Sequence, residues 1–181
     1  MYPEFQTSRF LLQQILPKDQ PFIFEGLGNP QVIPFYGVQY NTVEETIAQM
    51  HYYDRLWRDG TGGWWKIVDK KTAEKMGAVG FNNYILQHAK CEVGYWLLPQ
   101  HWGKGIISEA LPEIIAYLFN HKKTHRIEAL VEEGNNKSCN VAQKARFTME
   151  GILRDYEIKN GRYISLRMYS LLASDAKHAT K

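Results

Sequence analysis

The stretch from Glu92 to Leu111 places the strongest constraint on the fold, because it reads as an apolar strand, a glycine turn and the start of an amphipathic helix. Gly103 and Gly105 lack a Cβ, so backbone N–H groups in the turn can approach an anion closely. The helix that follows adds unpaired N–H donors and the positive end of its dipole. This order of elements predicts a binding site for a diphosphate.

The spacing of the turn excludes two classes of nucleotide site. A Walker A loop has four residues between its glycines followed by Lys and then Ser or Thr, and a dinucleotide-binding loop has the pattern Gly-x-Gly-x-x-Gly. The segment from Gln100 to Gly105, Gln-His-Trp-Gly-Lys-Gly, fits neither pattern. We therefore expect that the ligand is neither a nucleoside triphosphate nor NAD.

Length and composition indicate one folded domain. The chain has 181 residues, of which 44% are hydrophobic, and this is enough for one full core but too short for two comfortable domains. We expect the domain to span residues 1–172. The polar remainder, 173–181, is expected to be a flexible tail.

Composition also bears on location and partners. No apolar run approaches the roughly 18 residues needed to span a bilayer, and the first residues lack the pattern of a secretion signal. The net charge of +3 is too small for a nucleic-acid-binding surface. Cys91 and Cys139 do not have the spacing of metal ligands, and lone cysteines of this kind are usually reduced. We expect a cytoplasmic protein with no metal and with no membrane or nucleic-acid partner.

The periodicity of apolar residues predicts an alternation of strands and helices. Strands are expected at 9–16, 64–68, 76–86, 91–98, 126–131, 147–158 and 163–172, and helices at 19–27, 43–59, 107–118 and 137–145. Short polar turns between the second, third and fourth strands predict an antiparallel meander. The glycine turn and its helix then form a βαβ crossover, and Asn160-Gly161 is typical of a hairpin between the last two strands.

Several short motifs follow one another along almost the whole chain. They are Arg9-Phe-Leu-Leu12, Val93-Gly-Tyr-Trp-Leu97, Gln100-x-x-Gly103-x-Gly105, Asn135-x-x-Ser138 and Glu150-Gly-x-Leu-Arg-Asp155. With these motifs in this order, the chain resembles the GCN5-related N-acetyltransferases (GNAT), and within them the ribosomal-protein (RimJ/RimL-like) branch. The resemblance implies an α+β fold in three layers, with a mixed, mostly antiparallel sheet of about seven strands flanked by about four helices.

The resemblance also implies the reaction. An amine attacks the thioester of acetyl-CoA directly in a ternary complex, and the acceptor is a primary amine, either a protein N-terminus such as that of a ribosomal protein or a small molecule. The alternative is a module that binds acyl-CoA without transferring the acyl group. A homodimer is compatible with either reading.

On the donor side, the resemblance implies that the glycine turn binds the pyrophosphate of CoA and that the preceding strand binds pantetheine through its backbone. The implied residues are Trp96, Leu97, Leu98, Gln100, Gly103, Lys104, Gly105, Ile106, Ile107 and Asn135. A free N–H at Leu97 or Leu98 would face the thioester oxygen. Lys104 is either a direct contact or a solvated lysine of the turn.

The catalytic residues implied by the resemblance are Ser138, as the proton partner of the departing thiol, and Glu92, as the general base. Ser138 and Asn135 are also good helix caps, so a capping role competes for both. Glu128 or a chain of water molecules is the alternative base. The tyrosine that the wider family often uses as the acid is replaced here by Ala142.

On the acceptor side, an aromatic wall around the amine is expected from Phe35, Tyr36, Trp64 and Trp65. Core packing is the competing role for aromatic residues of this kind. The long irregular segment 32–40 favours a substrate loop.

Overall fold

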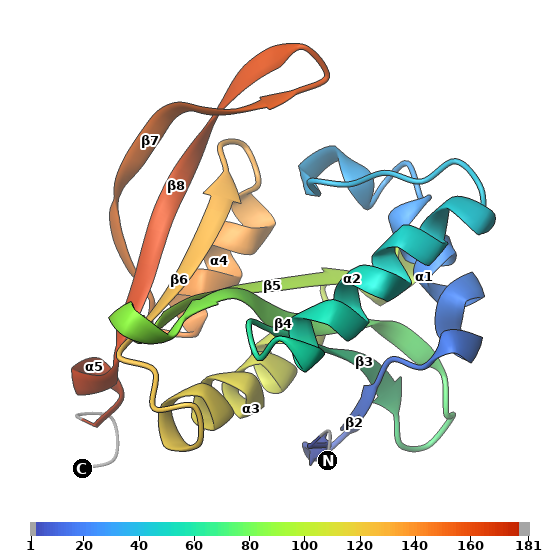
Figure 1. Cartoon of the computed structure of the whole chain (residues 1–181), viewed down its shortest axis with the longest axis horizontal. Coiled ribbons are helices and arrows are strands. Elements are labelled where there is room, and N and C mark those ends of the chain that lie inside the picture. The colour runs from blue at the N-terminus through green and yellow to red at the C-terminus, as the bar shows by residue number, and fades with distance from the viewer. Residues whose placement is uncertain (1–2, 178–181) are drawn as a thin grey trace.

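The computed structural model of the chain describes residues 3–177 (Figure 1). Within this range eight strands form one sheet, in the spatial order β1-β2-β3-β4-β5-β6-β8-β7. The first five strands are antiparallel neighbours: β1 (Phe5–Gln6), β2 (Phe10–Gln14), β3 (Gly63–Asp69), β4 (Lys75–Ile85) and β5 (Lys90–Leu97). The predicted meander is therefore present as β3, β4 and β5.

The second half of the sheet follows the helical crossover. Strand β6 (Arg126–Glu132) lies parallel to β5, and it pairs with β8 (Arg162–Leu172), which in turn pairs with β7 (Thr148–Lys159) at the edge. The β7–β8 hairpin turns at Asn160-Gly161, as expected, and in Figure 1 its tip projects beyond the rest of the molecule.

The described part of the chain contains five α-helices: α1 (Gln20–Leu27), α2 (Ile47–Arg58), α3 (Ile106–Asn120), α4 (Asn136–Lys144) and α5 (Ala173–Lys177). Before α2, the Glu45 N–H bonds the Thr42 hydroxyl, and the Glu45 carboxylate accepts from the Asn41 N–H. None of the helices described is both long and apolar enough to cross a membrane.

Two hydrophobic cores lie on opposite faces of the sheet. One face of β5 contributes Cys91 and Val93 to the core beneath α3 and α4. The other face contributes Trp96, which packs with residues of α1 and α2. We call these the α3/α4 face and the α1/α2 face. The alternation of side chains along β5 thus places neighbouring residues on different sides of the sheet.

The parallel strands β5 and β6 separate after a short stretch of pairing. They pair at only three positions, Lys90–Arg126, Cys91–Ile127 and Glu92–Glu128, and then diverge. Figure 1 shows β5 and β6 splaying apart toward their C-terminal ends. The remainder of β5 therefore presents an unpaired edge toward β6.

The structure confirms the expected fold class and every strand and helix expected from the sequence. It adds β1, which has only two residues and leaves no detectable periodicity. It also adds α5, which forms from residues 173–177 of the expected tail. The remainder of that tail, 178–181, lies outside the described residues.

Candidate active site

The glycine turn leads from β5 into α3. After a 3-10 turn at Pro99–His101, Gly103 and Gly105 have φ angles of 74° and 72°, in the left-handed region that favours glycine. Helix α3 then begins at Ile106, with no side chain capping its N-terminus. The N–H groups of its first turn have no partner within the helix, so they are available to an anion.

The side chains of Ile106 and Ile107 point into the core and are 2% and 5% exposed. These two residues therefore offer the ligand their backbone N–H groups alone. Gln100 and Lys104 are exposed beside the turn. The backbone of the turn thus fits a diphosphate, and the lysine charge lies on its solvent side.

Arg9 holds the turn from the N-terminal strand region. Its guanidinium donates to the Lys104 carbonyl at 3.2 and 3.3 Å and forms an ion pair with Glu109 of α3 at 2.6 Å. Burial alone would raise the pKa of Glu109, but hydrogen bonds from Thr7, Arg9 and Ser8 outweigh it and hold the pKa at about 2. Arg9 belongs to one of the sequence motifs, but its contact with the glycine turn was not predicted from the sequence.

Trp102 connects the turn to the end of β5. Its Nε1 donates to the Leu97 carbonyl at 2.9 Å, and the Lys137 ammonium of α4 lies 4.2 Å from its ring centroid. Lys137 therefore adds positive charge beside the turn, whereas the charge of Arg9 is paired with Glu109. Sequence reasoning missed Trp102 and Lys137, because only the folded arrangement brings α4 to the turn.

The hydrogen-bonding direction of β5 identifies the backbone groups that face β6. The Leu98 N–H donates to the Met76 carbonyl at 2.9 Å, on the β4 side. Backbone groups alternate in direction along an antiparallel pair, so those of Val93, Tyr95 and Leu97 face the other way, toward the unpaired edge. Two N–H groups were considered from the sequence as donors to the thioester. That of Leu98 already bonds β4, and that of Leu97 faces the separation between β5 and β6.

The side chains of Trp96 and Leu98 are 3% and 2% exposed in the core of the α1/α2 face. A Cβ on Gly26 of α1 would lie 2.1 Å from the Trp96 ring, so the glycine allows the helix to lie directly on the indole. The backbone groups of both residues face β4, so of Trp96, Leu97 and Leu98 only Leu97 presents backbone groups to the unpaired edge, which corrects the expectation that all three bind pantetheine.

Asn135 and Ser138 lie at the start of α4. The Asn135 side-chain oxygen caps the helix by accepting from the Ser138 N–H at 3.1 Å. Ser138 is the third residue of the helix, so it is the capped residue and not the cap. Capping therefore accounts for Asn135 and leaves the purpose of the Ser138 hydroxyl to be explained.

Glu92 and Glu128 form the last pair before β5 and β6 separate. Glu92 alternates with the residues of the α3/α4 core, so its side chain belongs to the α1/α2 face. Its carboxylate accepts from the Asn83 side chain at 3.1 Å. Burial raises the pKa of Glu92, and the charges of Glu157 and Glu128 raise it further against the opposing effect of the Asn83 hydrogen bond.

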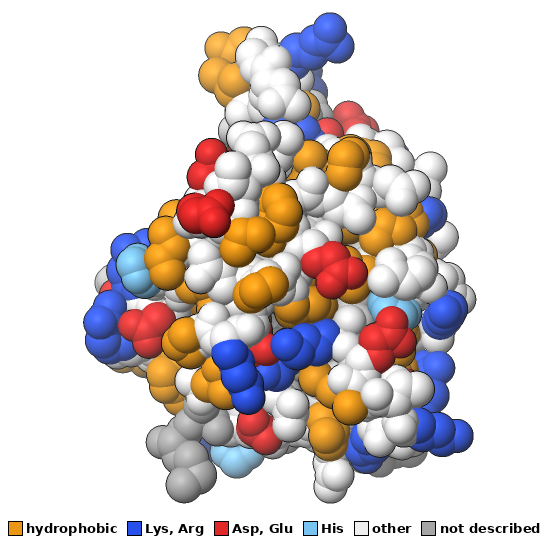
Figure 2. All heavy atoms as spheres, turned by 90° about the vertical axis from the view of Figure 1, so that its right-hand side faces the viewer, with side chains coloured by type: hydrophobic (Ala, Val, Ile, Leu, Met, Phe, Trp, Pro, Cys, Tyr) orange, Lys and Arg blue, Asp and Glu red, His pale blue; other side chains and the backbone are white. Residues whose placement is uncertain are grey.

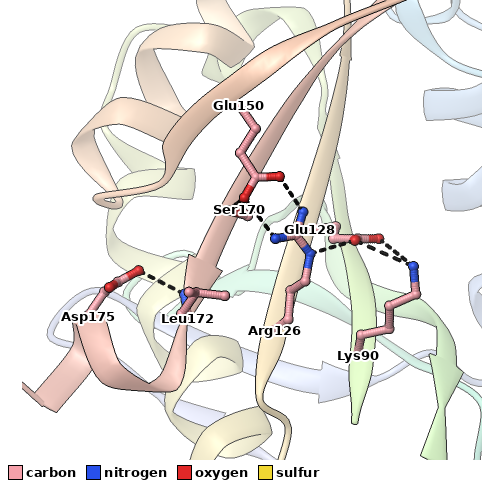
Figure 3. A network of polar contacts seen from close by, with 7 residues as sticks. All are labelled: Lys90, Arg126, Glu128, Glu150, Ser170, Leu172 and Asp175. Atoms are coloured by element: carbon pink, nitrogen blue, oxygen red, sulfur yellow. Dashed lines mark hydrogen bonds and ion pairs between the residues drawn. The ribbon is translucent and has the colours of Figure 1, made fainter. Parts of the chain in front are cut away.

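Glu128 is surrounded by positive charge (Figure 3). Arg126 donates to it at 2.7 Å, and the Lys90 ammonium lies 3.4 Å away. Arg126 also makes two hydrogen bonds to Glu150, which accepts a third from the Ser170 hydroxyl at 2.6 Å. Glu128 is thus part of a structural ion network, whereas Glu92 has a neutral amide as its partner.

The aromatic residues expected on the acceptor side occupy different environments. Phe35 is 47% exposed, and its ring lies near Gly134 in the connection between β6 and α4. Tyr36 packs against the core of the α1/α2 face, where burial and the neighbouring Tyr53 raise its pKa well above the ordinary value. In Figure 2 hydrophobic side chains gather in the middle of the side of the molecule that α1 and α2 present.

Trp64 and Trp65 are neighbours in β3 and point to opposite faces of the sheet. Trp64 is 4% exposed in the α1/α2 core, and its ring would contact a Cβ placed on Gly94 of β5 at 3.0 Å. Trp65 is fully buried on the α3/α4 face, and its Nε1 donates to the Pro3 carbonyl. The two indoles do not form one wall, and both have the packing role that the sequence analysis held as the alternative.

Lys159, the last residue of β7, contacts two other parts of the structure. Its ammonium bonds the carboxylate of Glu132 at the end of β6 and the carbonyl of Pro34, which belongs to the 3-10 turn Ile33–Phe35. The ammonium also lies 5.7 Å from the centroid of the Phe35 ring. The β7–β8 hairpin is thereby linked to the segment expected to bind the acceptor.

Comparisons with known proteins identify the family of this chain. The acetyltransferase (GNAT) domain matches residues 9–148. An uncharacterized N-acetyltransferase of Bacillus subtilis, YoaA, is 31% identical over 173 residues, which are 95% of this chain and 98% of the relative. The ribosomal-protein-serine acetyltransferase of Escherichia coli is 27% identical over 159 residues, covering 88% of this chain and 84% of the relative.

A solved structure shows the same fold. The spermidine N-acetyltransferase from Vibrio cholerae, in complex with CoA and spermine, has a TM-score of 0.81 and 22% sequence identity, and the match covers 93% of this chain and 98% of that chain. The domain match and the full-length relatives confirm the resemblance inferred from the motifs. The chain therefore belongs to the GNAT acetyltransferase family and is an N-acetyltransferase.

Proposed function

We propose that the chain transfers the acetyl group of acetyl-CoA to a primary amine by direct attack of the amine on the thioester in a ternary complex. The observation that carries the proposal is the alignment of the glycine turn with the unpaired edge of β5. The turn offers N–H groups to a diphosphate, and the edge offers backbone groups to an extended amide-containing arm.

In this proposal the donor binds through backbone groups. The N–H groups of Gly103, Gly105, Ile106 and Ile107 bind the pyrophosphate, Arg9 holds the turn in place, and Lys137 adds positive charge nearby. Pantetheine lies along the edge of β5. The Leu97 N–H then donates to the thioester oxygen, where one such donor typically stabilises the transition state by about 3 kcal/mol.

Glu92 is the proposed general base, and because it lies five residues from Leu97 along β5, about 16 Å at the usual strand rise, it would receive the proton through water. A base must be ionised to accept the proton of the amine, and its pKa is best placed nearer to the operating pH than that of an ordinary carboxyl. Burial raises the pKa of Glu92 in that direction. Glu128 is the weaker candidate, because Arg126 and Lys90 already bind its carboxylate.

For the acceptor we propose first a protein N-terminal α-amine and second a small-molecule amine. The Escherichia coli relative, named for its ribosomal-protein substrate, supports the first class. The spermidine N-acetyltransferase with the same fold supports the second. A basic acceptor of either class would find the carboxylate of Glu92 on the side of β5 and β6 that the proposal assigns to it, whereas Glu132 on the same side is paired with Lys159.

The test is an assay of CoA release from acetyl-CoA with a panel of acceptors. The panel contains short peptides with different N-terminal residues, the same peptides with a blocked N-terminus, and polyamines of increasing length. Release with free but not blocked peptides supports an N-terminal acceptor, and release with polyamines alone supports the second class. Tight CoA binding without release on any acceptor would favour the binding-module alternative.

A further inference from the structure

Tyr95 lies in the middle of the unpaired edge of β5, between Val93 and Leu97. Its backbone groups face the separation between β5 and β6, as the alternation of the strand requires. Its side chain packs half-buried against the core of the α3/α4 face. Tyr95 therefore extends from the strand that would bind pantetheine to the helix that faces it.

The hydroxyl of Tyr95 reaches the first turn of α4. It lies 3.5 Å from the Ser138 carbonyl oxygen, a long contact for an O–H donor. The hydroxyl of Ser138 belongs to the same turn, and Ala142 one turn later offers only a methyl group. Tyr95 and Ser138 thus bring two protic groups together where β5 faces the start of α4.

The long contact leaves the hydroxyl of Tyr95 weakly engaged and able to turn toward a ligand. Burial raises the pKa of Tyr95 to about 12, and this effect outweighs the hydrogen bond to Ser138. The hydroxyl therefore stays protonated over the pH range in which proteins operate. It is a permanent hydrogen-bond donor in this location.

We infer that Tyr95 donates its hydroxyl hydrogen bond to the sulfur of CoA as the thioester is cleaved. The inference rests on the proposed function, because it places the sulfur beside the edge of β5. The amine nitrogen forms a bond to the carbonyl carbon, the carbon–sulfur bond breaks, and the electron pair stays on sulfur. The proton of the amine passes to Glu92 or to water.

The proton of Tyr95 stays on its oxygen during this step. Thiols are more acidic than this buried phenol, and the cysteine thiol, for example, has a pKa of about 8.5, so the thiolate takes its own proton from water. Tyr95 stabilises the negative charge that develops on sulfur, in the same way that an oxyanion donor stabilises an oxygen. The role is electrostatic and needs no ionised tyrosine.

The test compares Tyr95→Phe with Tyr117→Phe. Tyr117 is a second tyrosine that packs against the same core, from α3, so the control removes a hydroxyl from a similar setting away from the edge of β5. Tyr95→Phe is expected to lower kcat about ten- to a hundredfold, which is the effect of losing one hydrogen bond to a charged group. The KM for acetyl-CoA should change less than about threefold, and Tyr117→Phe should leave kcat unchanged.

A second measurement reports on sulfur directly and needs no acceptor. The thiol of enzyme-bound CoA is titrated by the ultraviolet absorbance of its thiolate. Loss of the donor in Tyr95→Phe should lower the acid dissociation constant of the bound thiol about tenfold relative to wild type. A lost packing contact would not produce this change.

The outcomes separate the two proposals. An unchanged thiol titration in Tyr95→Phe overturns the role of Tyr95 whatever the effect on turnover. A shifted titration with no turnover on any amine supports the role of Tyr95 and rejects the proposed acceptors. A wild-type chain that does not bind CoA overturns both.

Discussion

The Nε1 of Trp102 donates a hydrogen bond to the carbonyl oxygen of Leu97 across 2.9 Å. This bond connects the turn proposed for the pyrophosphate to the strand edge proposed for pantetheine. It also occupies the Leu97 carbonyl, so that its N–H is the group of that residue left to face the donor. The two parts of the proposed donor site are therefore held in one arrangement by this bond.

Replacing Trp102 by Phe is expected to weaken CoA binding about fivefold. The change removes one hydrogen bond, worth about 1 kcal/mol, and reduces the contact of the ring with the Lys137 ammonium. Isothermal titration with CoA measures the effect. The control is Trp57→Phe in α2, which should bind CoA as wild type does; an equal loss in both variants would contradict the role of Trp102.

Replacing Gly103 by Val is expected to weaken CoA binding about a hundredfold while the chain stays folded. A branched residue at a φ of 74° is strained. If the backbone rotates to relieve this strain, the N–H groups of the turn point away from the ligand, and the two effects together weaken binding by about 3 kcal/mol. Gly161→Val is a matched control, since Gly161 has a φ of 75° and equally open space around its Cβ. It should lose similar stability in thermal unfolding and no CoA affinity.

The sequence predicts the strands, the helices and the glycine turn because each depends on local spacing. The direction of a side chain within a strand is also local, so the opposite placement of Trp64 and Trp65 follows from their being neighbours. Their burial in two different cores is the physical reason that they do not line one site.

Other features of the site depend on contacts between distant segments. The choice between Leu97 and Leu98 as donor follows from the register of β5 against β4, which no local pattern specifies. The approach of Tyr95 to α4 follows from the packing of that helix against the separated strands. Long-range pairing of this kind is seen only in the folded chain.

Ser138→Ala is expected to lower kcat about tenfold and to leave CoA affinity within about twofold of wild type. Ser138 is not the cap of α4, and its side chain lies beside the Tyr95 hydroxyl, where it can give a second hydrogen bond to the sulfur. Losing one hydrogen bond to a charged group has an effect of this size. Asn135→Ala is the companion variant, and loss of its cap should cost about 1 kcal/mol of folding stability. Steady-state kinetics and thermal unfolding separate the two roles; a stability loss alone in Ser138→Ala would reject a catalytic hydroxyl.

Lys159→Met is expected to lower the KM for a basic acceptor about fivefold without changing CoA affinity. The Lys159 ammonium neutralises Glu132 beside Phe35. Without the ammonium, the carboxylate of Glu132 can attract a basic acceptor and strengthen its binding by about 1 kcal/mol. Kinetics at varied acceptor concentration and low salt measure the change. Lys144→Met, in the last turn of α4, is the control, and an unchanged KM in both variants would place the acceptor elsewhere.

Glu92→Gln is expected to lower kcat about a hundredfold, the usual lower range for loss of a general base. In wild type, kcat should rise with pH as Glu92 loses its proton, at a pH above the ordinary carboxyl value because burial raises its pKa. This limb of the profile should disappear in the variant. Measurement of kcat across the acidic and neutral range with saturating acceptor tests the expectation.

Although kcat should fall in Glu92→Gln, the stability of this variant should stay the same or rise. A carboxyl whose pKa is raised on folding binds its proton more tightly in the folded chain, so its charged form opposes folding above that pKa. A neutral Gln at position 92 removes this opposition, and Glu92→Gln should unfold at the same temperature as wild type or higher at neutral pH. Glu128→Gln is the contrast, since it leaves Arg126 and Lys90 without their shared carboxylate and should lower the unfolding temperature. Loss of stability in Glu92→Gln would mean that the glutamate is structural and that the base lies elsewhere.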